Sequence, residues 1–363
     1  MKRILLFIDS LGAGGAQRQL TGLAVMLKHR GYYVKVITYY NRPFYKYILD
    51  DGGCNYECFN INSKLCLPKL ITEIIKFRTD VLISFQTDPN ALACIAAFVT
   101  RTKLIVSERN THQSISYKDR LIFNLYRLAD KIVPNSHSEG EFIENNFKFL
   151  KKKIFVISNF VDLNLFTPIS DKSIGAIRRL LIVASVKTSK NTQPFIRAMR
   201  LAFDRGARFK VTWYGINPAD NDLPENVMYA KNCLDMIKQL GMENFFRLLP
   251  KRTDIQHAYD KADIFCLPSL FEGTPNVICE AMSSALPVIA SNVCDNALFV
   301  KEGYNGLLFN PNDVKSMSDA LMRVYAMPDS ELLLWGKRSR NLAEELCSEK
   351  VFVEKYIDLI DSI

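Results

Sequence analysis

The chain has 363 residues, of which 48% are hydrophobic and 23% are charged, and it carries a formal net charge of +9 at pH 7. This length suits two domains with full hydrophobic cores, and the composition excludes a disordered or fibrous protein. No stretch approaches the roughly 20 consecutive apolar residues that a membrane-spanning helix needs.

The positive charge is concentrated in the first half of the chain. Residues 1–165 contain 23 Lys and Arg against 14 Asp and Glu, whereas residues 166–363 contain 24 of each kind. Such an asymmetry indicates that one domain meets an anionic partner. We expect an anionic membrane surface and not nucleic acid, because no nucleic-acid-binding module is recognisable and the aromatic residues fall in apolar segments. A basic surface that serves only solubility remains the alternative.

The nine cysteines indicate a reducing compartment. They occur singly, without Cys-x2-Cys spacing, and several lie in apolar segments, where cysteine acts as a small hydrophobic residue. An odd number without paired spacing argues against a disulfide framework and against zinc. We therefore expect a cytoplasmic protein, held peripherally on the inner face of the plasma membrane if its basic half meets lipid.

Apolar segments alternate with amphipathic ones along the first half, which predicts parallel strands joined by helices. The predicted strands are Ile4–Ile8, Tyr33–Thr38, Val81–Ser84, Lys103–Val106, Lys131–Pro134 and Ile154–Ile157. The predicted helices lie near Ala16–His29, Leu67–Lys76, Asn90–Val99, Lys118–Ala129 and Glu139–Asn145. In the fourth helix we expect Leu121, Leu125 and Leu128 to pack in the core, although the basic and aromatic residues around them would also suit a membrane.

A glycine-rich segment with Gly12, Gly14 and Gly15 follows the first predicted strand. Glycines let a backbone approach a ligand closely and adopt positive φ, and the helix that begins near Ala16 offers its N-terminal amides to an anion. The segment lacks the complete Gly-x-Gly-x-x-Gly pattern of dinucleotide-binding folds. By itself it is a weak signal, because many tight strand-to-helix turns use glycine.

A second alternating series follows a linker near residues 166–171. The predicted strands are Leu180–Ala184, Lys210–Tyr214, Phe245–Leu249, Ile264–Leu267, Val288–Ser291 and Gly306–Phe309. The predicted helices lie near Asn191–Asp204, Asn232–Leu240, Ile255–Lys261, Pro275–Ser283 and Val314–Met327. The segment Glu331–Ile363 is expected to be helical, with Val351–Ile360 as a separate amphipathic piece. Two such series predict two doubly wound sheets, which bind ligands at the carboxyl ends of their strands.

The most informative segment is a strand, an elbow and a helix start between residues 262 and 282. Thr274 suits an N-cap and Pro275 suits the first helical position, so the elbow should present amides to an anion. Glu272 precedes this start, and Glu280 lies about one and a half turns inside the helix, on the order of 9 Å along it. Carboxylates accept hydrogen bonds from sugar hydroxyls. A ligand with its phosphate at the elbow would have one carboxylate near each of the two groups that the phosphate joins. This arrangement suits a nucleotide-sugar.

The Glu-x7-Glu spacing after a small-residue elbow resembles the signature of the retaining glycosyltransferases of family 4, the group 1 type. Further motifs extend the resemblance over nearly the whole chain. It implies the GT-B fold, with two doubly wound Rossmann-like α/β domains facing a central cleft and a C-terminal helix that crosses back to the first domain. We accordingly expect an acceptor-binding domain over residues 1–167, a donor-binding domain over 168–345 and the C-terminal helix over 346–363.

The resemblance also implies the donor site. The family clamps the donor diphosphate with an arginine and a lysine five residues apart; here Lys190 is present, Ser185 stands at the arginine position, and Lys187 could supply the missing charge. Glu272 is expected to orient the donor sugar and Glu280 to hold the ribose. The other expected donor-binding residues are Gly14, Gly15, Gly215, Gly273, Thr274, Pro275 and Asn276.

On the acceptor side, Arg109 stands where many family members have a histidine. An arginine there could bind a phosphate with two parallel hydrogen bonds, so Arg109 joins Glu272 and Lys190 as a candidate catalytic residue. The resemblance places Arg18, His112, Asn135 and Ser136 near the acceptor. No Asp-x-Asp motif occurs, so we expect neither a metal nor another cofactor.

We therefore expect a retaining glycosyltransferase that moves a hexose-type sugar from a UDP- or GDP-sugar to a hydroxyl of a glycan, in the biosynthesis of bacterial surface polysaccharides or glycoconjugates. A lipid-linked glycan is the expected acceptor. Two alternatives stay open: a nucleotide-sugar epimerase of the GT-B type, and a non-catalytic subunit that binds nucleotide-sugars. The departures at Ser185 and Arg109 keep the second alternative credible.

Overall fold

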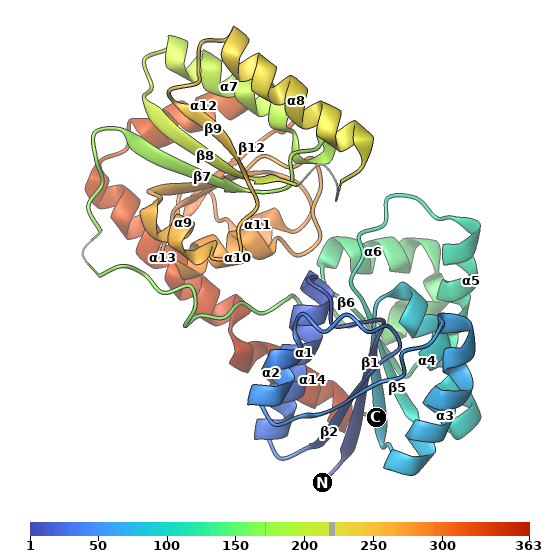
Figure 1. Ribbon diagram of the computed structural model, residues 1–363. Coiled ribbons are helices and arrows are strands. Elements are labelled where there is room, and N and C mark those ends of the chain that lie inside the picture. The colour runs from blue at the N-terminus through green and yellow to red at the C-terminus, as the bar shows by residue number, and fades with distance from the viewer. Residues whose placement is uncertain (171, 218–221) are drawn as a thin grey trace. The chain divides into compact units, whose positions relative to one another are not determined.

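The computed structural model describes residues 1–170, 172–217 and 222–363, and the chain forms two compact units (Figure 1). One unit comprises Met1–Phe160 with Glu349–Ile363, and the other comprises Val161–Ser348. The division thus falls earlier than the expected boundary after residue 167. The reason is packing, because Phe160 is buried in the core of the first unit whereas Val161 and Phe166 are buried in that of the second.

The first unit contains a six-stranded parallel sheet in the order β3-β2-β1-β4-β5-β6. Its strands are β1 (Arg3–Ile8), β2 (Tyr33–Thr38), β3 (Asn55–Cys58), β4 (Val81–Phe85), β5 (Lys103–Glu108) and β6 (Lys131–Pro134). Its α-helices are α1 (Gly15–His29), α2 (Lys46–Asp51), α3 (Cys66–Phe77), α4 (Thr87–Thr100), α5 (Tyr117–Leu125), α6 (His137–Asn146) and α14 (Glu349–Asp361). Short 3-10 helices occupy Ser63–Leu65, Tyr126–Leu128 and Lys148–Lys153.

Both faces of this sheet are buried, as its nearly continuous apolar strands require. Along β1, Ile4 and Leu6 pack with α1 and α14 on one face, whereas Leu5 and Phe7 pack with α3 and α4 on the other. Figure 1 shows α1 and α14 together on one side of the sheet, although more than 300 residues separate them in sequence. The C-terminal helix therefore completes the core of the first unit, as expected from the GT-B resemblance.

The second unit contains another six-stranded parallel sheet, in the order β12-β11-β10-β7-β8-β9. Its strands are β7 (Arg178–Val183), β8 (Phe209–Ile216), β9 (Phe246–Pro250), β10 (Ile264–Leu267), β11 (Val288–Ser291) and β12 (Gly306–Phe309). Its α-helices are α7 (Thr192–Asp204), α8 (Pro224–Gln239), α9 (Gln256–Lys261), α10 (Asn276–Ser283), α11 (Asn296–Phe299), α12 (Val314–Tyr325) and α13 (Asp329–Cys347), and a 3-10 helix covers Thr188–Lys190.

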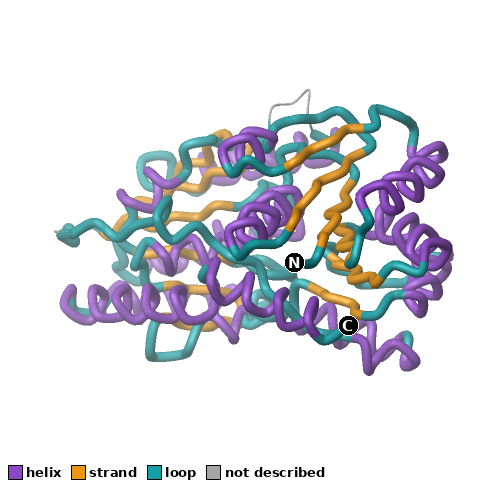
Figure 2. The backbone as a smooth tube through the Cα atoms, turned by 90° about the horizontal axis from the view of Figure 1, so that it is seen from below, coloured by secondary structure: helices purple, strands orange, loops and turns teal. Residues whose placement is uncertain are grey.

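Helices cover the two faces of the second sheet in different ways. Leu180 and Ile182 pack under α7, α8 and α12 on one face, whereas Leu181 packs with α9 and α10 on the other. In both units the strands run between helices (Figure 2). Both sheets are doubly wound, so their ligand-binding edges lie at the carboxyl ends of their strands.

Several elements differ from the expectation, and the short helices α2 and α11 were not predicted. β3 was not predicted, and it is an edge strand whose Glu57 accepts a 2.6 Å hydrogen bond from Lys35 of β2. The expected strand Ile154–Ile157 is reduced to a bridge between Ile132 and Ile154. Helix α8 begins eight residues earlier than predicted, at Pro224, which suits a first helical position because its missing N–H would be unpaired there.

The last expected helical segment is divided, because Ser348 adopts an extended conformation (φ −68°, ψ 151°) between α13 and α14. In α5, Ser116 and Asp119 form a reciprocal capping box, which sets the start of that helix. Leu125 and Leu128 pack against the core as expected, but Leu121 is 53% exposed, so its assignment to the core was wrong. No helix in the described part of the chain is long and apolar enough to cross a membrane.

Candidate functional site

The carboxyl edge of the second sheet brings Lys190 and Glu272 together. Lys190 ends the 3-10 helix after β7, and Glu272 lies in the elbow after β10. The Lys190 ammonium donates a 2.5 Å hydrogen bond to the Glu272 carboxylate, and their side chains are 19% and 13% exposed. The two loops are also joined by the Leu270 amide, which donates to the Ser189 carbonyl. Two residues 82 positions apart thus form an ion pair that a ligand can still reach.

The helix start after this elbow lies one residue later than predicted. Helix α10 begins at Asn276, and Pro275 precedes it with a non-helical ψ of 78°. Pro275 is therefore the N-cap and not the first helical residue, and Thr274 is not the N-cap. Thr274 is buried and Gly273 is half-buried, so the elbow itself is tightly packed.

Glu280 is buried in α10, which excludes a solvated helix face for this carboxylate. It is 6% exposed and accepts a 2.9 Å hydrogen bond from the hydroxyl of Tyr259 in α9. Hydrogen bonding of this kind fixes the orientation of a carboxylate before any ligand arrives.

Gly215, one of the expected donor-binding residues, lies near the end of strand β8. A Cβ at this position would be 1.7 Å from the Ala184 carbonyl oxygen, a distance that no side chain tolerates. The glycine therefore allows the end of β8 to approach the segment that follows β7. The Gly215 carbonyl accepts a hydrogen bond from the Val186 amide there, which helps to shape the loop that leads to Lys187 and Lys190.

Lys187 has a neighbour that sequence reasoning missed. Lys251 follows β9, and its pKa is lowered by partial burial and by the nearby Lys187 ammonium, against the opposing effect of Asp222. The Lys187 charge thus disfavours the charged form of Lys251, and an anion between the two loops would offset this effect. No motif distinguished Lys251 in the sequence, because the proximity depends on how two loops meet. Ser185, at the expected arginine position, is half-buried.

The first unit has a cavity of about 790 Å³ at the carboxyl edge of its own sheet. It is lined by the ends of β1, β4 and β5, by the segment after β2 and by α5. The polar lining residues are Asp9, Tyr39, Tyr40, Ser63, Gln86, Thr87, Asp88, Asn110, His112, Lys118 and Asp119. Hydroxyls, amides and carboxylates are the commonest groups among these polar residues, and Pro89, Ala91, Leu92, Leu121 and Ile122 complete the lining. The polar groups suit a ligand that carries hydroxyl groups.

Among the residues expected in the first unit, His112 lines this cavity. Its Nδ1 lies 2.7 Å from Oε1 of Glu139, and its backbone amide donates a 2.8 Å hydrogen bond to Oε2 of the same carboxylate. Glu139 is fully buried, and its hydrogen bond raises the pKa of the His112 imidazole. The ring also stacks on Phe142. His112 is therefore an oriented histidine with a bias towards the charged form, and not a loose surface residue.

Arg109 is held within the first unit. Its guanidinium donates 2.6 Å hydrogen bonds to Asn159 and to the hydroxyl of Tyr356 in α14, and it lies 4.4 Å from the centre of the Phe85 ring. Its neighbour Glu108 is fully buried and accepts hydrogen bonds from Thr87, Tyr126 and two backbone amides. In the structure described here, Arg109 thus fastens α14 to the end of β5.

In the glycine-rich loop after β1, Gly14 does not adopt the positive φ that the sequence suggested. Gly14 is the N-cap of α1 in an extended conformation (φ −130°, ψ 159°), so it does not need positive φ. A Cβ on Gly14 would meet the Gln17 side chain, which donates a hydrogen bond to Asp9. Gly15 is exposed at the first turn of α1, and Arg18 is half-buried in the same helix.

Asn135 and Ser136 follow β6 and are both buried. The Ser136 hydroxyl accepts a 3.2 Å hydrogen bond from the Glu139 amide and so caps α6. This cap places Glu139 where it can hold His112. The Ser-x-x-Glu pattern at 136–139 signals a helix start in the sequence, but it does not reveal that the carboxylate turns to a histidine in another loop.

The described residues include no group of three or more His, Cys, Asp or Glu side chains placed to hold a metal ion.

Comparison with protein families gives two matches that together cover most of the chain. A model described as Glycosyl transferases group 1 matches residues 177–327, and one described as Glycosyltransferase Family 4 matches residues 13–165. The first match contains Lys190, Glu272 and Glu280, and the second contains Gly14, Arg109 and His112.

Two curated relatives match over most of their length. The chain is 26% identical to an uncharacterized glycosyltransferase of Haemophilus influenzae, covering 98% of this chain and 99% of that protein. It is 27% identical to the N-acetylgalactosamine-N,N'-diacetylbacillosaminyl-diphospho-undecaprenol 4-alpha-N-acetylgalactosaminyltransferase of Campylobacter jejuni, covering 88% of this chain and 89% of that enzyme.

Among solved structures, Anabaena HepE in complex with UDP and glucose matches with a TM-score of 0.83, covering 100% of both chains at 19% identity. At this identity the likeness concerns the fold. It confirms the expectation of two Rossmann-like units of the GT-B type.

Proposed function

Because this chain belongs to the family 4, group 1 glycosyltransferases, we propose that it is a retaining enzyme that transfers a sugar from a UDP- or GDP-sugar to a hydroxyl of a lipid-linked glycan. The observation that carries the proposal is the accessible Lys190–Glu272 ion pair beside the start of α10, with the buried Glu280 inside the same helix. The solved HepE complex contains UDP and glucose, and the Campylobacter relative is named for a diphospho-undecaprenol acceptor. Surface polysaccharide or glycoconjugate biosynthesis is the corresponding role.

The donor site proposed here lies in the second unit. Lys190 and Lys187 neutralise the diphosphate, with the elbow of Gly273, Thr274, Pro275 and Asn276 beside it. Glu272 accepts hydrogen bonds from the sugar hydroxyls, and the oriented Glu280 accepts them from the ribose. The Lys190–Glu272 pair supports these roles, because its ammonium can serve the leaving phosphate while its carboxylate turns to the sugar. Lys251, close to Lys187, adds positive charge to the same loop cluster.

The chemistry proposed here breaks the bond between the sugar C1 and the diphosphate oxygen and forms a bond from C1 to the acceptor oxygen on the same face of the sugar. The proton of the acceptor hydroxyl passes to an oxygen of the departing diphosphate. Negative charge grows on that diphosphate as the bond breaks, so fixed ammonium groups stabilise the transition state more than the ground state. We propose that this charge comes from lysines and helix amides and that transfer needs no added metal.

The acceptor site proposed here uses the cavity in the first unit. Its hydroxyl, amide and carboxylate lining suits a glycan, and His112 is oriented in it by Glu139. Asn135, Ser136, Arg18, Gly14 and Gly15 shape the same edge of the sheet. The Arg109 guanidinium supports the site by fixing α14 and the Asn159 loop, as its hydrogen bonds indicate.

Membrane association belongs to the proposal, because the excess positive charge lies in the first half of the chain. Tyr117 and Leu121 of α5 and Phe149 of the 3-10 helix Lys148–Lys153 are large exposed apolar residues, and lysines accompany them. Such side chains suit the interface of an anionic bilayer, where each basic residue contributes about 1 kcal/mol. All nine cysteines are free thiols, which supports placement on the cytoplasmic face.

The proposal is tested by incubating the protein with UDP-, GDP- and ADP-sugars, with and without a lipid-linked glycan acceptor. Nucleotide release that requires the acceptor indicates transfer, a new nucleotide-sugar without acceptor indicates an epimerase, and binding without turnover indicates a non-catalytic subunit. Retention is read from the anomeric configuration of the product by NMR.

The site is tested by the substitution Glu272→Gln, which removes the charge and keeps the shape of the side chain. We expect kcat/KM to fall by at least about 100-fold, the size expected when one transition-state contact is lost. Glu243→Gln, at an exposed position of the same unit, is the matched control. Equal transfer rates in the two variants would rule out this assignment.

A further inference from the structure

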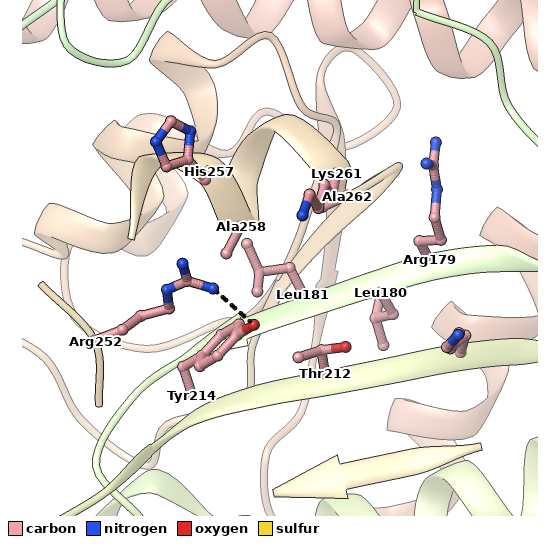
Figure 3. A pocket seen from close by; sticks show the side chains of 11 residues that line it. Arg179, Leu180, Leu181, Thr212, Tyr214, Arg252, His257, Ala258, Lys261 and Ala262 are labelled. Carbon is pink, nitrogen blue, oxygen red and sulfur yellow. Dashed lines mark hydrogen bonds between the residues drawn. The ribbon is translucent and has the colours of Figure 1, made fainter. Parts of the chain in front are cut away.

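The Val161–Ser348 unit has a second cavity, and none of the residues proposed to bind the donor lines it (Figure 3). It has a volume of about 270 Å³ and lies between α9 and the sheet face formed by β7 and β8. In Figure 3, Leu181, Thr212 and Tyr214 form its floor, and Ala258 and Lys261 of α9 lie above them. Lys190, Glu272 and Glu280 do not line it, and neither does Tyr259, the α9 residue that orients Glu280.

The side chains that line this cavity include several basic ones. Its lining includes the cationic or titratable side chains Arg179, Lys210, Arg252, His257 and Lys261. Among the described residues that line it, there is no aspartate or glutamate. A binding cavity with basic side chains and no carboxylate is suited to an anion.

Three of these side chains have an aspartate partner. Arg179 pairs with Asp263 through two hydrogen bonds from its guanidinium, and Arg252 pairs with Asp254. The His257 ring lies 3.4 Å from Asp260.

Lys210 and Lys261 differ from the other three, because they form no hydrogen bond or ion pair with any residue that the structure describes. Lys210 stands beside Arg179 in the register of β8 and β7, and Lys261 ends α9. Two ammonium groups at this cavity are therefore left without a counter-charge from the protein.

The strand pattern explains why such a cavity exists. Along β8, Phe209, Val211 and Trp213 are buried under the helices of the opposite face, whereas Lys210 and the residues in step with it face the cavity. Position 210 is exposed, and Thr212 and Tyr214 are only half-buried. The floor thus combines a hydroxyl, an aromatic ring and aliphatic side chains, which can contact the body of a small molecule whose charge meets the lysines.

We propose that this cavity binds a small phosphomonoester. A phosphomonoester carries a charge of about −1.5 to −2 at neutral pH, which matches the two ammonium groups without a counter-charge, whereas a carboxylate carries only one charge. Lysine is a common point-charge ligand of phosphate, and the Thr212 hydroxyl can donate a further hydrogen bond. The organic part can be a sugar or a nucleoside. The proposal does not depend on the transferase reaction, because none of the proposed donor residues is involved.

The experiment uses the whole protein with its donor site first saturated by UDP. Inorganic phosphate, glucose 1-phosphate and UMP are then titrated separately by calorimetry, so that the tightest probe distinguishes a sugar from a nucleoside source. The test variant is Lys210→Gln with Lys261→Gln. The matched control is Lys231→Gln with Lys238→Gln, two exposed lysines of α8 in the same unit.

We expect at least one probe to bind the wild type, and the test variant to weaken it by at least about tenfold, since two charge-assisted contacts are lost. The control variant should bind within about twofold of the wild type, and UDP affinity should be unchanged in both. If the double variant does not fold, the single variant Lys261→Gln replaces it, with the same expected direction. The proposal is overturned if no probe binds the UDP-saturated wild type, or if test and control variants bind it equally.

Discussion

The two units have the same doubly wound architecture but treat the charged groups at their carboxyl edges in opposite ways. In the Val161–Ser348 unit, Lys190 and Glu272 pair with each other and stay partly exposed. In the other unit, Glu108 and Glu139 are completely buried and are used up by hydrogen bonds to neighbouring loops. An ion pair that keeps some access to solvent contributes less to stability than a buried carboxylate, which cannot lose its partners without a large cost. The Lys190–Glu272 pair can therefore exchange its partner for a ligand, whereas Glu108 and Glu139 mainly hold the loops around their cavity in place.

The largest expected effect comes from breaking the open pair. Lys190→Ala should lower the rate of sugar transfer by about 100- to 1,000-fold, because it removes positive charge from the proposed leaving-group site. The free energy of unfolding should change by less than about 1 kcal/mol, as for other partly exposed pairs. Transfer assays and urea unfolding measure the two effects.

Lys231→Ala, which removes an exposed lysine of α8, serves as the matched control for Lys190→Ala. A loss of stability in Lys190→Ala as large as that expected for a buried carboxylate would remove the contrast between the units.

The second effect is on stability and concerns the buried carboxylate of the first unit. Glu139→Ala leaves the His112 amide and ring without their acceptor and should lower the free energy of unfolding by about 3 kcal/mol. Glu141→Ala, at an exposed position of the same helix, should change it by less than about 0.5 kcal/mol. Chemical denaturation of both variants checks this, and equal midpoints would show that Glu139 is not structural.

Features that depend on local sequence were predicted, whereas features that depend on contacts between distant segments were not. The strands Ile264–Leu267, Val288–Ser291 and Gly306–Phe309 match the prediction residue for residue, because short apolar runs between turn signals are local. β3 was missed because two of its four residues are Asn55 and Glu57, and pairing with the neighbouring strand stabilises it.

The candidate site was predictable as a set of residues but not as a set of contacts. The elbow, Glu272 and Lys190 follow from motifs, yet no local pattern shows that these two side chains meet across 82 positions. Glu139 and Lys251 were missed for the same reason, since each acquires its role from a different loop. Cys294 shows a further limit, because it has a left-handed φ of 47° without being the glycine that such a conformation favours.

The third effect tests how backbone packing shapes the open edge. Gly215→Ala would place a Cβ 1.7 Å from the Ala184 carbonyl oxygen, so β8 and the loop before Lys187 must move apart. We expect a loss of about 1–3 kcal/mol in unfolding free energy, typical of overpacking, together with weaker UDP binding. Gly175→Ala is the control, since its Cβ would be 3.9 Å from the nearest atom. Thermal unfolding and calorimetry with UDP measure the two effects. Equal stability and equal UDP affinity in the two variants would contradict a role of Gly215 in shaping this edge.

The smallest expected effect is a pH dependence that arises in the closed edge. Glu139 raises the pKa of His112 above its ordinary value of 6.5, and Glu108 and Asp119 act in the same direction. Because the pKa of His112 is higher in the folded protein than in the unfolded chain, the His112–Glu139 interaction stabilises the folded state fully below pH 6.5. This stabilisation is lost as the pH rises through the pKa that His112 has in the folded protein. The difference in unfolding free energy between the wild type and His112→Gln should therefore be largest below this pH and shrink above it. His137→Gln, at an exposed neighbouring position, is the control variant. Urea unfolding of the wild type and the variants across this pH range measures the effect. If the difference in unfolding free energy between the wild type and His112→Gln grew with pH, the folded state would instead stabilise the neutral imidazole.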